Sequence, residues 1–184
     1  HPGSAKNKMK NSILIGLEFQ SMLPENEKPQ YTEKYEGFFH LNNIGGNVEN
    51  TTLHYIVRDH DMTRFEERKA LGNKIGEFLN AKYGEGTVEV EIADTYYNMA
   101  EKIRPHMYLM DVAAEAFKEL GIETPAINPV RGGTDGSRLS YMGLPCPNLC
   151  TGGFAFHGPY EHITVEGMDL SVKIILGIIG KYAK

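Results

Sequence analysis

The sequence is poor in cysteine and has no long hydrophobic run. Its two cysteines, Cys146 and Cys150, are separated by three residues, one more than a CxxC motif has, and no second pair accompanies them. This spacing favours buried, reduced thiols over a disulfide or a metal site. The longest apolar stretch, Val172–Ile179, is interrupted by Lys173 and Gly177 and is too short to cross a bilayer. These features predict a cytoplasmic protein that does not enter the membrane.

Basic residues are also outnumbered by acidic ones. The chain has 19 Lys and Arg against 24 Asp and Glu, which gives a net charge of −5 and an isoelectric point near 5.8. A protein that binds nucleic acid needs a basic surface, so this balance excludes that class of partner. The 184 residues are 41% hydrophobic, which is enough for one or two small domains with their own cores.

The first half of the chain alternates helical and strand patterns. Apolar spacing predicts a helix after a Ser4 cap, two strands joined by a glycine turn, a helix opened by a Thr63–Glu66 capping box, and an alternating strand. These elements span residues 5–22, 37–42, 51–59, 63–83 and 88–93. A ferredoxin-like unit has the order strand, helix, strand, strand, helix, strand. Residues 1–98 are therefore predicted to form an α+β, ferredoxin-like domain that lacks its first strand.

The second half, residues 99–184, has a different pattern. A helix over 108–120 ends at Gly121. Thr164 caps a last helix that runs to about residue 183, with an apolar face of Met168, Val172, Ile175, Leu176 and Ile179. A short helix over 137–142, which Asp135 would cap, lies between two short apolar runs, 126–130 and 147–151. Strands that alternate with helices favour parallel pairing in an α/β layer. The fold class predicted for the whole chain is α/β, with a boundary between residues 98 and 99.

The stretch from Pro129 to His162 contains the residues best suited to chemistry. Arg131 precedes a Gly-Gly-Thr-Asp-Gly turn that opens a short helix, so its guanidinium and the N–H groups of the turn favour an anion. The alternative for Arg131 is an ordinary surface ion pair. His157 lies between two glycine-containing turns, where a neutral imidazole suits zinc. The alternative for His157 is a structural loop histidine, which is also our interpretation of His162.

Five segments, in collinear order, resemble the peptidase T family. They are HPGSAKNKM, EGFFHLNNIGGNVENTTLHYIVRDHD, DTYYNM, RGGTDGSRLSYMGLPCPNLCTGG and FHGPYEH. That family consists of aminotripeptidases among the dinuclear-zinc exopeptidases, which also include aminoacylases and glutamate carboxypeptidases. The resemblance implies a ferredoxin-like lid, or dimerisation, domain over residues 1–98. It implies that residues 99–184 are the C-terminal segment of a zinc-exopeptidase catalytic domain.

The resemblance also implies roles for four residues. His157 corresponds to the family's C-terminal zinc-ligating histidine, and Arg131 to the arginine that grips the C-terminal carboxylate of the peptide. Arg58 corresponds to a lid arginine that also contacts substrate. His1 corresponds to a lid histidine that reaches the active site of the other subunit and stabilises the oxyanion. The implied protein is a zinc aminopeptidase for tripeptides, with two zinc ions per active site and a homodimer formed through the lid.

The family's other metal ligands have no counterpart in the sequence. In the family they lie mostly in an N-terminal half that includes a His-x-Asp segment and a Glu-Glu pair. No His-x-Asp occurs here, and the adjacent Glu66 and Glu67 lie in a charged segment typical of a surface helix. We therefore expect the C-terminal portion of a larger enzyme, inactive alone and binding little or no zinc. The alternatives are a non-catalytic dimerisation or interaction module, and a related aminoacylase or dipeptidase.

Overall fold

The computed structural model describes residues 1–183, which form two compact units. The first unit comprises His1–Asp94 together with Pro129–Arg131, and the second comprises Thr95–Asn128 and the residues from Gly132 onward. Three residues from the second half of the chain, Pro129–Arg131, therefore pack with the first unit. The domain boundary at residues 98 and 99 stays a prediction.

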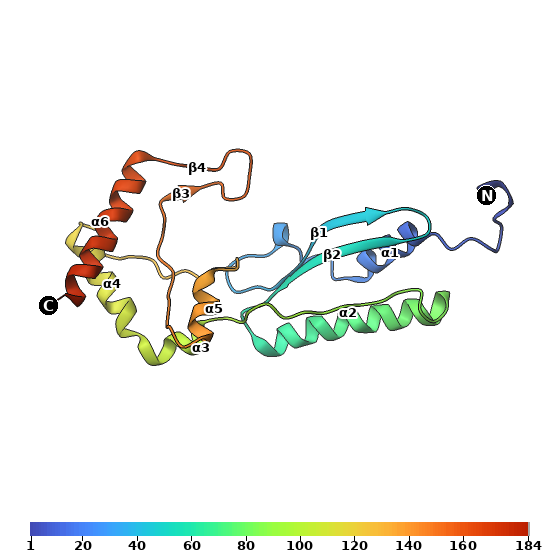
Figure 1. Ribbon diagram of the computed structural model, residues 1–184, viewed down its shortest axis with the longest axis horizontal. Helices are drawn as coiled ribbons and strands as arrows, with labels where there is room; N and C mark the ends of the chain where they lie inside the picture. The colour runs from blue at the N-terminus through green and yellow to red at the C-terminus, as the bar shows by residue number, and fades with distance from the viewer. Residues whose placement is uncertain (184) are drawn as a thin grey trace. The chain divides into compact units, whose positions relative to one another are not determined.

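The first unit consists of helices and one antiparallel hairpin (Figure 1). Its elements are the 3-10 turn Pro2–Ser4, α1 (Ser12–Met22), the 3-10 turn Pro29–Tyr31, β1 (Phe38–Gly46), β2 (Thr51–Arg58) and α2 (Met62–Tyr83). Strands β1 and β2 pair with Phe38 opposite Arg58 and Gly46 opposite Thr51, with an irregularity between Leu41 and Asn43. The predicted hairpin is confirmed, and β1 extends four residues beyond its predicted end at Asn42.

Both long helices of the first unit begin at residues other than the predicted ones. Helix α1 begins at Ser12, where the Asn11 side chain accepts hydrogen bonds from the next turn, and not after Ser4. The reason is Asn7, whose φ of 62° lies in the left-handed region and cannot continue a right-handed helix. Helix α2 is capped by Asp61, whose carboxylate accepts from Arg64 N at 2.9 Å, so the predicted Thr63–Glu66 box is not used.

The core of the first unit lies between the two helices and the hairpin. Its buried side chains are Ile15, Leu23, Phe39, Ile75 and Leu79. Polar side chains join the same elements at the margin of this core. Glu18 of α1 accepts hydrogen bonds from Lys82 Nζ and Tyr83 Oη of α2, both at 2.6 Å, and these two donors lower the pKa of Glu18. Tyr55 of β2 donates to Gln20 of α1 at 2.8 Å, and burial raises the pKa of Tyr55 to about 12.

The strand predicted over residues 88–93 is absent, so that prediction was wrong. The segment runs back along α2 as extended chain (Figure 1). Asn80 of α2 occupies the backbone groups that a neighbouring strand would use: Asn80 Nδ2 donates to Val88 O, and Val88 N donates to Asn80 Oδ1, both at 2.8 Å. Val90 packs against Gly76, where an added Cβ would lie 2.7 Å from Val90 Cγ2. The helix, not a sheet, holds this segment.

The second unit is built mainly from helices. Its elements are α3 (Ala100–Ile103), the 3-10 turn Arg104–His106, α4 (Tyr108–Glu119), α5 (Asp135–Tyr141), β3 (Gly153–Phe154), β4 (His162–Ile163) and α6 (Val165–Tyr182). Gly121, with a φ of 85°, follows α4, and Thr164 caps α6, so both predicted helix ends are confirmed. Thr134, and not Asp135, is the residue that precedes α5.

Helices α4 and α6 pack against each other, but not through the expected stripe of α6. Ala116 and Ile174 are buried at this contact, and Lys181 pairs with Glu115 and Glu119 of α4 at 3.2 and 2.7 Å. The apolar stripe that the sequence indicated for α6 is exposed in the structure: Met168, Val172, Ile175, Leu176 and Ile179. None of the helices described in residues 1–183 is both long and apolar enough to cross a membrane.

The strands predicted over 126–130 and 147–151 do not form. In residues 95–183 of the second unit the sheet structure is the short antiparallel hairpin of β3 and β4. A strand needs a hydrogen-bonded neighbour, and the prolines at 125, 129, 145 and 147 remove backbone donors from these two runs. The parallel α/β layer expected from the sequence is therefore not present among the described residues.

The Asn80 contact with Val88 predicts a specific loss of stability. Asn80→Ala should lower the free energy of unfolding by about 1–3 kcal/mol, because the half-buried backbone groups of Val88 lose both partners. Asn73→Ala, an exposed asparagine on the same helix, should change it by less than about 0.5 kcal/mol. Urea unfolding followed by circular dichroism measures both values. Equal values for the two variants would show that Asn80 does not hold the segment.

Candidate functional site

His157 lies at the tip of the β3–β4 hairpin. Its backbone is left-handed, with a φ of 65°, and its N–H donates to Glu161 Oε2 at 3.0 Å. At the base of the hairpin Phe154 stacks on His162 with ring centroids 5.4 Å apart. The His157 side chain is exposed, and among the described residues its imidazole makes no hydrogen bond. The sequence placed His157 correctly in a glycine-containing loop, and the structure presents its ring to solvent.

His157 fits the part of one metal ligand, but the described chain does not complete a metal site. Residues 1–183 bring together no group of three or more His, Cys, Asp or Glu side chains that could hold an ion. A zinc site in a protein takes three or four protein ligands. A zinc ion bound by His157 would therefore need further ligands that the described residues do not bring to it.

Arg131 is held in a cradle of oxygens on the first unit. Its Nη1 donates to Thr32 O at 2.6 Å, and its Nη2 donates to Thr32 Oγ1 at 2.6 Å and to Glu36 O at 3.1 Å. The guanidinium also lies 4.9 Å from the centre of the Phe38 ring. These contacts explain why Pro129–Arg131 belongs to the first unit. They also show that the two terminal nitrogens converge on oxygen atoms, as they would on a carboxylate.

Arg58, the second predicted substrate arginine, is the last residue of β2 and pairs in register with Phe38, whose ring contacts Arg131. The family resemblance implies a substrate contact for both arginines, but nothing in the sequence indicated that Arg131 would bind Thr32, 99 residues away. Phe38 is thus a common neighbour of Arg58 and Arg131.

Asp59, next to Arg58, is committed to an ion pair with Arg68 of α2. The side chains are nearly enclosed, with 1% of Asp59 and 12% of Arg68 exposed. Arg68 Nη2 also pairs with Glu27 Oε2 at 3.0 Å. A Cβ on Gly37 would collide with the Asp59 carboxylate and the Arg58 carbonyl, so this close approach requires glycine. The sequence offered no signal for Arg68, which is one charge in a highly charged segment.

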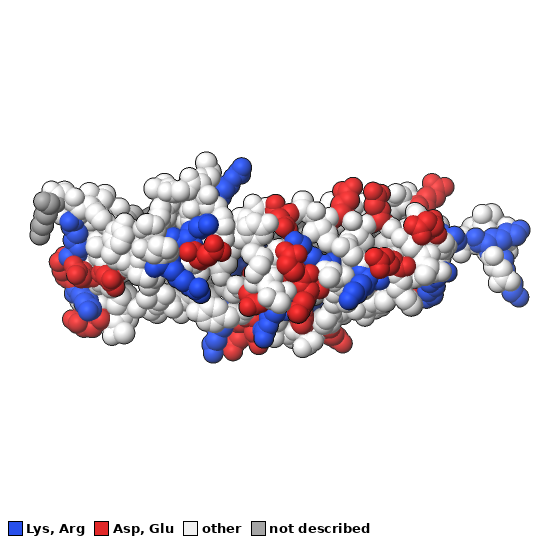
Figure 2. Space-filling model, turned by 90° about the horizontal axis from the view of Figure 1, so that it is seen from below, with Lys and Arg blue, Asp and Glu red and all other residues white. Residues whose placement is uncertain are grey.

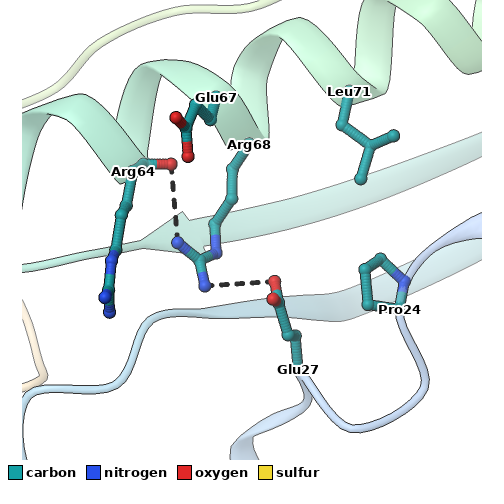
Figure 3. Close-up of a pocket in the computed structure, with 6 residues that line it drawn as sticks. All are labelled: Pro24, Glu27, Arg64, Glu67, Arg68 and Leu71. Atoms are coloured by element: carbon teal, nitrogen blue, oxygen red, sulfur yellow. Dashed lines mark hydrogen bonds and ion pairs between the residues drawn. The ribbon is translucent and has the colours of Figure 1, made fainter.

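The ion-paired side chains of Arg68 and Glu27 line a small open cavity of about 260 Å³ (Figure 3). It is lined by Pro24, Glu27, Arg64, Glu67, Arg68 and Leu71. Figure 3 shows Arg68 directed at Glu27 and at the Arg64 carbonyl, while none of the predicted site residues lines the cavity. On the face of the molecule drawn in Figure 2, acidic and basic side chains are interspersed and neither sign forms a broad patch.

The remaining candidates have local partners. His1 is exposed, and its Nδ1 accepts from Gly3 N at 3.2 Å, which caps the 3-10 turn Pro2–Ser4. Tyr97 packs edge-on against Tyr141, whose hydroxyl donates to Asn98 O at 3.2 Å. Tyr97 and Asn98 therefore help to join the start of the second unit to α5.

Comparison with known proteins covers the whole chain. A family model described as the peptidase dimerisation domain matches residues 1–87. The peptidase T proteins of Caldanaerobacter subterraneus and Alkaliphilus oremlandii are each 56% identical to this chain over 184 residues, which is 100% of this chain and 45% of each relative.

The chain is similar to these peptidase T proteins over its full length. It spans about 45% of the length of the curated peptidase T proteins it matches. Among solved structures, aminopeptidase PepT from Bacillus cereus aligns with a TM-score of 0.63 at 20% identity, over 100% of this chain and 48% of that one. A tripeptidase from Staphylococcus aureus aligns with a TM-score of 0.62 at 19% identity, over 96% and 46%. These likenesses show that the chain has the fold of the matching part of peptidase T.

The Arg68–Asp59 pair predicts a large effect on the stability of the first unit. Arg68→Ala should lower the free energy of unfolding by about 3–5 kcal/mol, because it leaves the Asp59 carboxylate buried without its cation. Arg64→Ala removes an exposed arginine from the same face of α2 and should cost less than about 1 kcal/mol. Urea unfolding of the two variants makes the comparison. A loss below about 1 kcal/mol for Arg68→Ala would contradict the role given to this pair.

Proposed function

We propose that this chain forms part of a zinc-dependent aminotripeptidase, an enzyme that removes the N-terminal residue from tripeptides. The observation that supports this most is the 56% identity to peptidase T over every part of the 184 residues. The shared neighbour Phe38 of Arg58 and Arg131 adds physical support, because a guanidinium suits a substrate that ends in a carboxylate. We place the activity in the reducing cytoplasm, where the free thiols of Cys146 and Cys150 would persist.

The chain's own residues would bind and orient the peptide. Arg131 would exchange the Thr32 and Glu36 oxygens for the two carboxylate oxygens of the substrate, and Arg58 would supply a second positive charge. Binding at the C-terminal carboxylate sets the distance to the scissile bond, which favours tripeptides over longer chains. Zinc, when bound, would supply Lewis-acid activation of the scissile carbonyl and of water. His157 would be one of its ligands.

The first unit would form a ferredoxin-like lid and the homodimer interface. Support comes from the match of residues 1–87 to the peptidase dimerisation domain. In such a dimer His1 would reach the partner's active site and donate a hydrogen bond to the developing oxyanion. The helices and hairpin of the first unit agree with the second to fifth elements of a ferredoxin-like order.

A second candidate is a non-catalytic dimerisation module. The same match of residues 1–87 favours it, together with the lack of a three-ligand metal cluster in residues 1–183. It differs from the first candidate in whether the 184-residue chain supports peptide hydrolysis when it is joined to the rest of a peptidase T. A related aminoacylase or dipeptidase shares the zinc chemistry and differs in whether a tripeptide carboxylate is required.

The chain by itself should not hydrolyse tripeptides. With zinc and trialanine it should release alanine no faster than a buffer blank, because one imidazole does not hold zinc in a defined site. The companion sample is a chimaera in which the chain replaces the matching 45% of the Caldanaerobacter subterraneus peptidase T. An active chimaera and an inactive chain support the proposal. An inactive chimaera that is folded by circular dichroism favours the dimerisation module.

Arg131 should act on the substrate carboxylate. In the chimaera, Arg131→Ala should lower kcat/KM for trialanine by the equivalent of roughly 2–5 kcal/mol, with Arg131→Lys between it and the parent. Trialanine amide lacks the carboxylate, so it should be a poor substrate of the parent and little affected by Arg131→Ala. Kinetic assays with both substrates measure this.

Two control variants separate this role from the cradle itself. Arg138 is an exposed arginine on α5, and Arg138→Ala should leave kcat/KM for both substrates unchanged. Thr32→Val removes one oxygen of the cradle but keeps the guanidinium, so it should not abolish the preference for the free acid. If the amide and the acid are cleaved equally well, Arg131 is a structural residue that fastens residues 129–131 to the first unit.

A further inference from the structure

The hairpin tip that presents His157 is held by a side chain that the proposed function does not use. Residues 155–161 connect β3 to β4, and two backbone hydrogen bonds fold them: Gly158 N donates to Ala155 O at 3.2 Å, and Glu161 N donates to Gly158 O at 3.1 Å. The third closing bond comes from a side chain, because His157 N donates to Glu161 Oε2 at 3.0 Å. Glu161 therefore bridges its own backbone turn to His157.

The backbone at His157 needs such a bond. Ala155 and His157 have φ values of 53° and 65°, and neither is a glycine. Residues with a Cβ populate the left-handed region sparsely, so tertiary contacts must hold them there. The N–H of His157 donates to the Glu161 carboxylate, and a carboxylate is a strong acceptor for it.

The rest of the hairpin fixes where Glu161 lies. Glu161 immediately precedes β4, and Phe154 pairs with His162 in register while their rings stack. The two ends of the tip are thus closed, and the Glu161 side chain spans back to the middle of the tip. Its bond uses the backbone of His157 and leaves the imidazole without a hydrogen bond among the described residues.

We propose that Glu161 is the positioning residue of His157: its carboxylate fixes the left-handed backbone and so the direction in which the imidazole projects. This inference rests on the proposed function, in which that imidazole is a metal ligand. A ligand held in place before the ion arrives binds it more tightly than one that must be ordered on binding. Glu161 would act through the backbone, whereas the usual outer partner of a metal-bound histidine acts through the ring.

The first test needs no metal. In the 184-residue chain, Glu161→Ala should speed amide hydrogen exchange at His157 by about tenfold, measured by NMR, because the N–H loses a charged acceptor. Glu161→Gln keeps a carbonyl oxygen at the same place and should restore most of the protection. Glu123→Ala, which removes an exposed glutamate elsewhere in the second unit, should leave the exchange rate unchanged. Equal exchange rates in all three variants would overturn the inference and leave the proposed function untouched.

The second test measures zinc in the chimaera. Glu161→Ala should weaken zinc binding by about 10–100-fold, with Glu161→Gln close to the parent, while His157→Ala should lose one ligand outright. If His157→Ala weakens zinc binding and Glu161→Ala does not, Glu161 is only a structural residue of the tip and the inference is wrong. If neither variant changes zinc binding although His157 exchange responds to Glu161, His157 is not a ligand. That result overturns the zinc role of His157 in the proposed function and the inference with it.

Discussion

The first unit depends on the ion pair between Asp59 and Arg68. Asp59 follows β2 directly, and its second oxygen accepts from Asp61 N at 2.8 Å, while Asp61 caps α2. One carboxylate therefore sets where the helix begins and also binds the helix about two turns further on, through Arg68. Arg68 extends the link to Glu27, in the segment that precedes the hairpin. Because the Asp59 side chain is almost fully enclosed, these contacts are made in a weakly screened environment, where removal of one partner is costly.

The arrangement has a functional consequence at the same end of the hairpin. Phe38 lies opposite Arg58 and under the Arg131 guanidinium, so the strand register makes Phe38 a neighbour of both arginines. The oxygens of Thr32 and Glu36 that receive Arg131 have the acceptor chemistry of a carboxylate. A site of this kind is ready for an acidic chain terminus but occupied by the protein's own oxygens. Substrate binding at Arg131 would thus be an exchange of partners, and its affinity would depend on how well the substrate competes with the cradle.

Sequence patterns predicted the elements that depend on local chemistry. The hairpin of β1 and β2, the body of α2, the Gly121 end of α4 and the Thr164 cap of α6 follow from periodicity, turn residues and capping residues that are close in sequence. Patterns failed where a partner was needed. Residues 88–93 alternate like a strand, yet Asn80 takes the backbone groups of Val88, and the runs at 126–130 and 147–151 have no neighbouring strand among the described residues. Alternation indicates a half-buried extended chain, and it does not indicate what will bind to that chain.

The sequence by itself determined the similarity to peptidase T, because 56% identity extends over 184 residues, and it determined that His157 sits between glycine-containing turns. Tertiary structure decided the partners of the charged residues. Arg68 is indistinguishable in sequence from the other charges of α2, and Arg131 reaches an oxygen cradle 99 residues away. The sequence also did not indicate that Glu161 binds the backbone of His157, although the two are only four residues apart. The hydrogen bond between His157 N and the Glu161 carboxylate forms in a tip whose backbone is left-handed at Ala155 and His157. Local spacing sets which groups are available, and only the folded chain sets the distances over which they act.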